Sequence, residues 1–165
     1  MNYKNLKYFS IPYKDMSSHY KEELFNLLTL SFDLPSFELH PFTIINGLII
    51  DKKLIASVSL LHHNDLLKIL KKNKNDEMTG YSKKGDDGLF IYNIAVDDNY
   101  RRKKLGEILI NLVIRENLNL KYLHCQVLKE NEPSFNLFFK CGFKIEEEMN
   151  DSDKNVVCVM SRNIQ

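Results

Sequence analysis

The stretch that decides the fold is Ile91–Leu109, which reads IYNIAVDDNYRRKKLGEIL. Leu89–Val96 is apolar and predicts a strand, and Asp97-Asp98-Asn99 predicts a turn after it. From Leu105 onward, apolar residues recur at the 3.6-residue spacing of a helix that packs on a sheet; they are Leu105, Ile108, Leu109, Leu112 and Val113. The stretch therefore predicts a strand, a short turn and a helix in succession.

The turn between this strand and helix is strongly basic. Arg101, Arg102, Lys103 and Lys104 place four positive charges just before the helix. The first backbone N–H groups of a helix have no partner inside it, and with the helix dipole they favour an anion such as a diphosphate. Gly106 has no side chain to keep the backbone away from such a ligand. We interpret the turn as an anion site; the alternative is a basic turn that only connects two elements.

The rest of the chain predicts an α/β domain around this centre. A first strand is expected at Tyr3–Ile11 and a helix from Ser18 to before Pro35, with Glu22 and Glu23 in its first turn. A hairpin of Thr43–Ile50 and Leu54–Leu61 around Asp51-Lys52-Lys53 is expected next, followed by a polar connection His62–Gly88 with a short helix at Asp65–Lys71.

After the central helix, the sequence predicts a strand at Tyr122–Leu128 and then a helix capped by Asn131, with Pro133 in its first turn and Gly142 after its end. The last two predicted strands are Phe143–Met149 and Asn155–Ser161.

Composition excludes several classes of protein. The 165 residues suit one domain, and 44% hydrophobic with 27% charged residues is an ordinary globular balance. A formal net charge of +1 gives no strong attraction to nucleic acid or anionic membranes, and no apolar run approaches the roughly 20 residues that span a bilayer. Three scattered cysteines fit neither a disulfide framework nor a zinc site. We expect no nucleic-acid partner, no membrane partner, no metal and a cytoplasmic location.

Two motifs resemble those of the GNAT superfamily of N-acetyltransferases. Ile94-Ala95-Val96 is similar to the family's strand end, Tyr100-Arg101 to the start of its pyrophosphate loop, and Gly106 to the last glycine of that loop. Val127–Phe143, with Asn131 and the closing Gly142-Phe143, is similar to its second signature. Lys104 departs from the pattern, because the family has a glycine there. The resemblance covers roughly residues 89 to 145.

The resemblance implies a fold, an activity and a cofactor site. The implied fold is a mixed, mostly antiparallel α/β (α+β) sheet of six to seven strands with helices on both faces, splayed between the two central parallel strands, in a single domain over residues 1–165. The implied activity is direct transfer of an acetyl group from acetyl-CoA to a primary amine of an unidentified acceptor. The implied acetyl-CoA contacts are Ile94, Ala95, Val96, Arg101, Arg102, Lys103, Lys104, Leu105, Gly106, Glu107, Asn131, Ser134 and Phe138. A catalytically weak or inactive acyl-CoA-binding or regulatory module is the alternative, and a dimer is possible.

The catalytic groups are less well defined by the resemblance. Phe138 occupies the position at which many family members have a tyrosine that protonates the departing thiolate. Tyr92 is the candidate substitute, with a core or surface tyrosine as the alternative. Glu38 and His40 are candidates for the base that deprotonates the amine, because the family's acceptor side includes this loop; exposed loop residues are the alternative.

Overall fold

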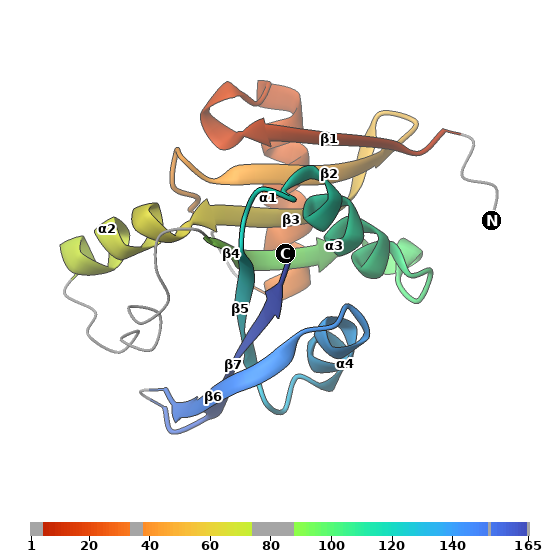
Figure 1. Cartoon of the computed structure of the whole chain (residues 1–165). Helices are drawn as coiled ribbons and strands as arrows, with labels where there is room; N and C mark the ends of the chain where they lie inside the picture. Colours follow the sequence, from red (N-terminus) through yellow and green to blue (C-terminus); the bar gives the residue numbers. More distant parts are fainter. Residues whose placement is uncertain (1–4, 34–37, 74–87, 152, 165) are drawn as a thin grey trace. The chain divides into compact units, whose positions relative to one another are not determined.

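The computed structural model describes residues 5–33, 38–73, 88–151 and 153–164. Seven strands form a sheet in the order β1-β2-β3-β4-β5-β7-β6 (Figure 1). β4 (Gly88–Val96) and β5 (Tyr122–Leu128) are parallel, whereas the pairs β1–β2, β2–β3, β5–β7 and β6–β7 are antiparallel. The predicted mixed, mostly antiparallel α/β sheet is confirmed.

The chain divides into two compact units, which are described separately. The first consists of residues 1–60 and 93–113, and the second of residues 61–92 and 114–165. The single domain over residues 1–165 stays a prediction. Parts of some predicted elements lie outside the described residues. These parts are the start of the first strand at Tyr3, Pro35 after the first predicted helix, and residues 74–87 of the connection His62–Gly88.

The first unit contains β1 (Lys7–Pro12), α1 (Ser18–Phe32), β2 (Ile44–Ile50), most of β3 (Lys53–His62) and the first part of α3 (Leu105–Glu116). The buried face of α1 packs on β2 and β3. Its core residues are Met16, Leu24, Leu27, Leu28, Ile45, Ile49, Leu54 and Ala95. Ala95, near the end of β4, is thus held in this apolar cluster.

The start of α1 differs from the prediction. Ser17 is the N-cap, its hydroxyl accepting from the backbone N–H of Tyr20, and the first turn contains no acidic residue. Glu23 has a different role, because its Oε2 accepts the backbone N–H of Leu54 at 3.2 Å. The assignment of Glu22 and Glu23 to the first turn was therefore wrong, since the cap lies one residue before the helix begins at Ser18.

The hairpin between β2 and β3 has a two-residue turn. Asp51 and Lys52 both have positive φ, 48° and 70°, and Ile50 pairs with Lys53. Positive φ at both central residues is the type I′ pattern, whose twist matches the flanking strands. The predicted hairpin is confirmed, with Lys53 in the strand rather than in the turn.

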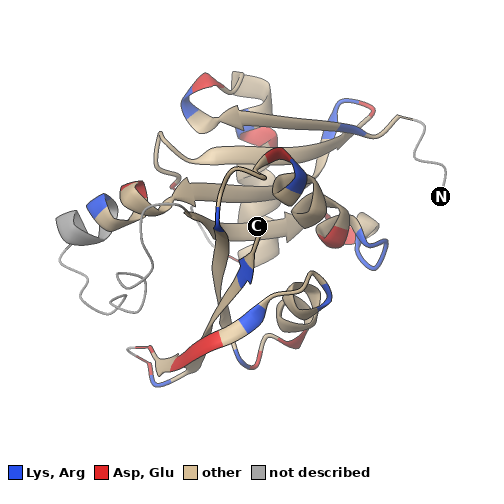
Figure 2. Ribbon diagram, in the orientation of Figure 1, with Lys and Arg blue, Asp and Glu red and all other residues tan. Residues whose placement is uncertain are grey.

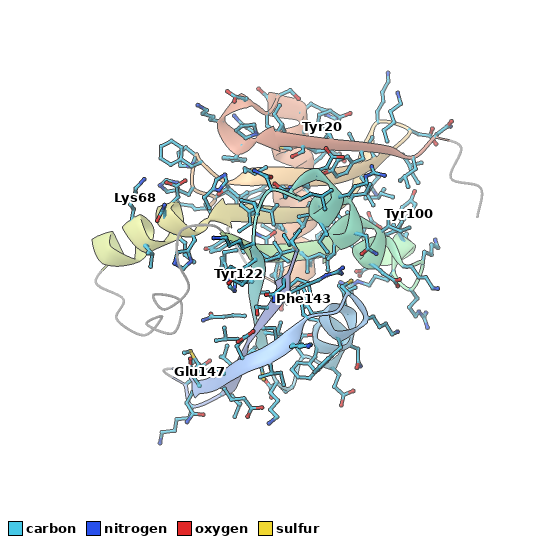
Figure 3. All side chains as sticks on the ribbon, viewed as in Figure 1. Tyr20, Lys68, Tyr100, Tyr122, Phe143 and Glu147 are labelled. Atoms are coloured by element: carbon cyan, nitrogen blue, oxygen red, sulfur yellow. The ribbon has the colours of Figure 1, made fainter. Side chains whose placement is uncertain are left out.

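The second unit contains α2 (His63–Asn73), the start of β4, β5, α4 (Glu132–Lys140), β6 (Lys144–Asn150) and β7 (Val156–Asn163). Leu61, Leu66, Phe90 and Val159 form a core cluster against which Met149 packs. Phe143, labelled in Figure 3, is fully buried. Its ring meets that of Phe138 of α4 edge-on, with centroids 5.1 Å apart. Phe143 therefore packs against α4 instead of starting the strand predicted at Phe143–Met149, and β6 begins at Lys144.

Two further elements are longer than predicted. α2 runs from His63 to Asn73 rather than from Asp65 to Lys71. β7 continues to Asn163, which pairs with Tyr122 at the start of β5, so the length of β5 sets the end of β7. No helix among the described residues is both long and apolar enough to cross a membrane.

Candidate functional site

The loop before α3 contains two residues in a left-handed conformation. Arg102 has φ 58° and Lys104 has φ 61°. This conformation costs an L-residue with a side chain roughly 1–2 kcal/mol, and glycine adopts it without that cost. Lys104 therefore has a backbone conformation that glycine adopts at lower cost. Non-glycine residues held in this region concentrate at functional sites, where the surrounding structure imposes them.

The first turn of α3 directs backbone N–H groups toward this loop. The N–H of Ile108 donates to the carbonyl of Lys104 at 2.9 Å, which closes the first helical bond. Over the described residues, the amides of Leu105, Gly106 and Glu107 make no hydrogen bond to protein. Successive N–H groups beside left-handed residues form a concave site for an anion. The predicted anion site thus has a matching backbone geometry.

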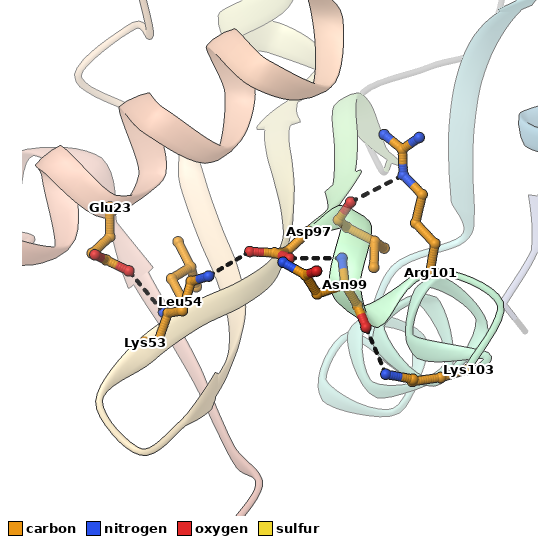
Figure 4. Close-up of polar contacts among 8 residues, drawn as sticks. Glu23, Lys53, Leu54, Asp97, Asn99, Arg101 and Lys103 are labelled. Atoms are coloured by element: carbon orange, nitrogen blue, oxygen red, sulfur yellow. Dashed lines mark hydrogen bonds and ion pairs between the residues drawn. The ribbon is translucent and has the colours of Figure 1, made fainter.

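The four basic side chains of the loop fall into two pairs, of which Figure 4 draws the first, Arg101 and Lys103. Arg101 forms an ion pair with Asp98 at 2.9 Å, and Lys103 donates to the carbonyl of Asn99 at 2.6 Å. Arg102 and Lys104 are exposed, and no ion pair is made by either within the described part of the chain. Arg101 and Lys103 therefore shape the loop, while Arg102 and Lys104 leave their charges available.

Asp97 ties the end of β4 to the β2–β3 hairpin (Figure 4). One carboxylate oxygen accepts from Lys53 Nζ at 2.7 Å and the other from the backbone N–H of Asn99 at 2.9 Å. The backbone N–H of Asp97 donates to the carbonyl of Ile55 at 2.9 Å. These contacts fix where the strand ends and the loop begins.

The contact between Lys53 and Asp97 favours the charged form of both side chains. Partial burial alone raises the pKa of the Asp97 carboxyl, but the hydrogen bonds from Lys53 and Asn99 outweigh it and hold that pKa below its ordinary value. The hydrogen bond to Asp97 raises the pKa of Lys53. Both groups are therefore charged at neutral pH.

The parallel pairing of β4 with β5 stops halfway. Gly88–Ile91 pair with Tyr122–Cys125, and the register of these two fully described strands contains no pair beyond Ile91 and Cys125. The second half of β4, which includes Ile94, Ala95 and Val96, thus has no partner in β5. The carbonyl of Val96 accepts a long bond, 3.4 Å, from Arg101 Nε.

Asn93 is a site candidate that sequence reasoning missed. Its side chain is buried, its Oδ1 accepts from Ser59 Oγ at 2.9 Å, and its Nδ2 has no partner among the described residues. A buried amide N–H without a partner is costly, so a water or ligand atom is expected beside it. The sequence signal that could have identified Asn93 was its amide side chain within the largely apolar strand Leu89–Val96.

Phe138, at the family's usual acid position, and Tyr92, the candidate substitute, lie in different environments. Phe138 is 3% exposed and packed against Phe143, and its ring has no group that could donate a proton. Tyr92 is 48% exposed and meets Phe90 edge-on at 6.4 Å. Only Tyr92 has a hydroxyl that solvent or substrate reaches, and its role as an acid stays a prediction.

The two candidate bases lie on the loop before β2. Glu38 is exposed, and His40 is half-buried with its ring 5.0 Å from that of Phe42. His40 Nδ1 accepts from the backbone N–H of Phe42 at 3.4 Å. The roles of Glu38 and His40 as bases stay predictions.

Asn131 and Ser134, two predicted cofactor contacts, belong to the second unit. Asn131 caps α4, with its Oδ1 accepting the backbone N–H of Ser134 at 3.3 Å. The predicted cap is confirmed, whereas the contact of either residue with acetyl-CoA stays a prediction. Asn131 is exposed, and the cap uses its Oδ1.

The cysteines have no site of their own. All three are free and buried, and burial raises the pKa of the Cys125 thiol well above its ordinary value. A thiol in this environment stays protonated and is a poor nucleophile. No group of three or more metal-binding side chains occurs within the described ranges.

Comparison with known proteins agrees with these features. Residues 7–143 match the model of the Acetyltransferase (GNAT) family. The ribosomal-protein-S18-alanine N-acetyltransferase of Escherichia coli has a similar structure, with a TM-score of 0.70 at 15% identity over 97% of this chain and 94% of that one. So does NAA60 of Arabidopsis thaliana in complex with acetyl-CoA, with a TM-score of 0.66 at 14% identity over 96% and 99% of the two chains. Ard1 of Thermoplasma volcanium gives 0.67 at 15% identity over 98% and 99%.

No curated protein matches the sequence significantly. At these identities the solved structures establish the shared fold, and the family model alone establishes membership.

Proposed function

The chain belongs to the GNAT family of acetyltransferases, and on this premise we propose that it transfers an acetyl group from acetyl-CoA to a primary amine in a ternary complex. The observation that carries the proposal is the loop before α3. There Arg102 and Lys104 are left-handed, and the amides of Leu105, Gly106 and Glu107 have no protein partner in the described structure. This arrangement suits a diphosphate such as that of coenzyme A.

The proposed cofactor contacts follow from that loop. The diphosphate accepts from the amides at the start of α3, and Arg102 and Lys104 balance its charge. The pantetheine arm pairs with the backbone of Ile94–Val96, which has no partner in β5. Asn131 and Ser134 are proposed to contact the arm as well.

The proposed chemistry is direct attack. The amine nitrogen bonds to the thioester carbonyl carbon, the C–S bond breaks, the amine loses a proton and the thiolate of coenzyme A gains one. A backbone N–H near Val96 stabilises the oxyanion. A thiol has a pKa of about 8.5, so a thiolate leaves readily near neutral pH even without the tyrosine that Phe138 replaces.

Tyr92, Glu38 and His40 are the proposed proton carriers, and each has a simple test. If Tyr92 protonates the leaving thiolate, Tyr92→Phe lowers kcat by about 10²-fold and leaves the KM for acetyl-CoA unchanged. If Glu38 or His40 deprotonates the amine, Glu38→Gln or His40→Gln lowers kcat by about 10²-fold and leaves the KM for acetyl-CoA unchanged. An unchanged kcat excludes the residue from proton transfer.

The first test is thermal unfolding with and without excess acetyl-CoA, with adenosine as a control. At about 100 times its dissociation constant, a ligand adds about 2.7 kcal/mol of stability. At about 2–4 °C per kcal/mol for a chain of this size, the midpoint rises by roughly 5–11 °C. No shift in the folded protein would contradict the proposed cofactor site.

A matched pair of variants assigns the shift to the loop. Lys104→Glu reverses a charge in the loop, and Lys52→Glu reverses the charge of another exposed lysine, also with positive φ, in the β2–β3 turn. We expect Lys104→Glu to weaken acetyl-CoA binding about tenfold and Lys52→Glu to leave it unchanged. Equal effects of both variants would mean that the loop does not hold the diphosphate.

The second test measures release of free thiol with a panel of amines. An α-amine of pKa about 8 is roughly one-tenth unprotonated at pH 7, whereas a lysine amine of pKa about 10.4 is about one in 2,500. The panel therefore includes a peptide with an N-terminal alanine, a lysine side chain and a polyamine. A thermal shift without turnover of any amine supports the alternative function, an acyl-CoA-binding module.

A further inference from the structure

A second basic feature lies in the second unit, on elements that contribute nothing to the α3 loop. A cavity of about 540 Å³ opens where α4 ends, β6 begins and β7 ends. Its lining includes Lys140, Lys144 and Arg162 and the single carboxylate of Glu146. Three cations against one carboxylate give the lining a formal charge of +2.

The three cations are not neutralised by the protein. Lys140, Lys144 and Arg162 make no ion pair in the described part of the chain. Two further acids of β6 lie outside the lining: Glu147, and Glu148, which pairs with Lys129 at 3.0 Å. Figure 2 shows the basic start of β6 followed by its acidic centre. The cavity therefore has an excess of positive charge that the fold leaves uncompensated.

Arg162 is held in place from one side. One guanidinium nitrogen, Nη1, donates to the carbonyl of Cys141, the residue that caps the end of α4. Arginine has five N–H donors in a planar fork, and this contact uses one edge of the group. The remaining donors are those that bind the two oxygens of a carboxylate or phosphate. The contact with Cys141 reduces the entropy that Arg162 would lose on binding.

An irregularity in β6 helps to form the cavity wall. The register between β6 and β7 shifts between Ile145 and Glu147, so Glu146 is an extra residue in the strand. Such a bulge changes the direction of side chains next to it. Glu146 accepts from the Ser161 hydroxyl, which holds the carboxylate at the wall. The one acid of the lining is thereby engaged by β7.

From these observations we propose that the cavity binds a compact dianion bearing a phosphate group, separately from the acetyl-CoA loop. The +2 formal charge matches a phosphate dianion, and the fork of Arg162 with the two lysine ammonium groups supplies donors to three of its oxygens. A cavity of about 540 Å³ accommodates inorganic phosphate or a small phosphate monoester. Binding such an ion offsets the mutual repulsion of the three cations.

The test is titration of the ¹⁵N-labelled full chain with inorganic phosphate, with sodium chloride at matched ionic strength as the control. The amide signals of Gly142 and Asn163, both in the lining, report on the cavity. The amides of Leu105 and Gly106 report on the α3 loop in the same spectra. We expect saturable phosphate-dependent shifts at Gly142 and Asn163. Shifts confined to the α3 loop, or equal shifts with chloride, would overturn the proposal.

Variants decide which charges hold the ion. Lys144→Gln removes an exposed cation of the lining, and Arg162→Gln removes the fork together with its contact to Cys141. Lys154→Gln is the matched control, because it removes an exposed lysine in the β6–β7 turn, outside the lining. We expect the phosphate Kd to rise at least about tenfold in Lys144→Gln and to be unchanged in Lys154→Gln. An unchanged Kd in Lys144→Gln would refute the site even if Arg162→Gln fails to fold.

Discussion

Replacing Lys104 by glycine should stabilise the protein, because the fold holds this lysine in a left-handed conformation. Its φ is 61°, its side chain is exposed, and neither an ion pair nor a side-chain hydrogen bond is made by it within the described structure. Lys104→Gly relieves roughly 1–2 kcal/mol of backbone cost. Glycine gives back about 0.5–1 kcal/mol through the greater freedom of the unfolded chain. At the midpoints of these two ranges the net gain is about 0.75 kcal/mol.

The assay is thermal or denaturant unfolding of the ligand-free protein. At about 2–4 °C per kcal/mol, the midpoint should rise by roughly 1–4 °C. Lys104→Ala is the first control, because it removes the same charge but keeps the Cβ that causes the cost, and it should give no gain. Lys103→Gly is the second control, since Lys103 lacks a positive φ and donates to the carbonyl of Asn99.

The prediction depends on opposite changes in stability, a gain for Lys104→Gly and a loss for Lys103→Gly. Lys103→Gly should destabilise the fold by about 0.5–1 kcal/mol or more, because it adds chain entropy and loses the bond to Asn99 without relieving strain. If Lys104→Gly is no more stable than Lys104→Ala, the left-handed conformation has no cost here. The explanation of how a lysine replaces the family's glycine would then be wrong.

Three other substitutions test the framework of the fold. Lys52→Gly, at the φ 70° position of the β2–β3 turn, should raise stability by about 0.5–1 kcal/mol in denaturant unfolding; a loss would argue against the type I′ geometry. Lys53→Met should lower the free energy of unfolding at pH 7 by no more than about 1 kcal/mol, since Lys53 is half exposed. This loss should fade as the pH drops below about 4 through the lowered pKa of Asp97, because a protonated carboxyl no longer pairs with Lys53. A loss that stays constant from pH 7 to 2 would exclude the ion pair as its cause. Asn131→Ala should cost about 1 kcal/mol through loss of the α4 cap, whereas Asn136→Ala on the exposed side of the same helix should cost almost nothing; equal losses would mean that the cap contributes little.

The sequence alone predicted most of the local structure, because local structure depends on residues close together in the chain. The spacing of Leu105, Leu109 and Val113 predicted α3, and all three side chains are buried. The cap at Asn131 and the paired strands of the first hairpin were likewise readable from neighbouring residues. The family resemblance then predicted a mixed, mostly antiparallel sheet with two parallel strands, and β4 and β5 are such a parallel pair.

The site itself was predicted only in part. The sequence placed the basic turn before α3 and identified the missing tyrosine at Phe138. It did not predict that Arg102 and Lys104 are left-handed, because neither residue type favours that conformation. It also overlooked Asn93, whose single polar side chain acquires meaning only when burial leaves its Nδ2 without a partner in the described structure.

What the sequence determined by itself is therefore the set of elements and the family, since both are written in spacings and motifs a few residues long. Tertiary structure decided which distant groups meet. Asp97 pairs with Lys53, 44 residues earlier in the chain. The basic cavity brings together the end of α4, the start of β6 and the end of β7. Such contacts depend on strand register and packing, which are set by the burial of many residues at once and not by any short stretch of sequence.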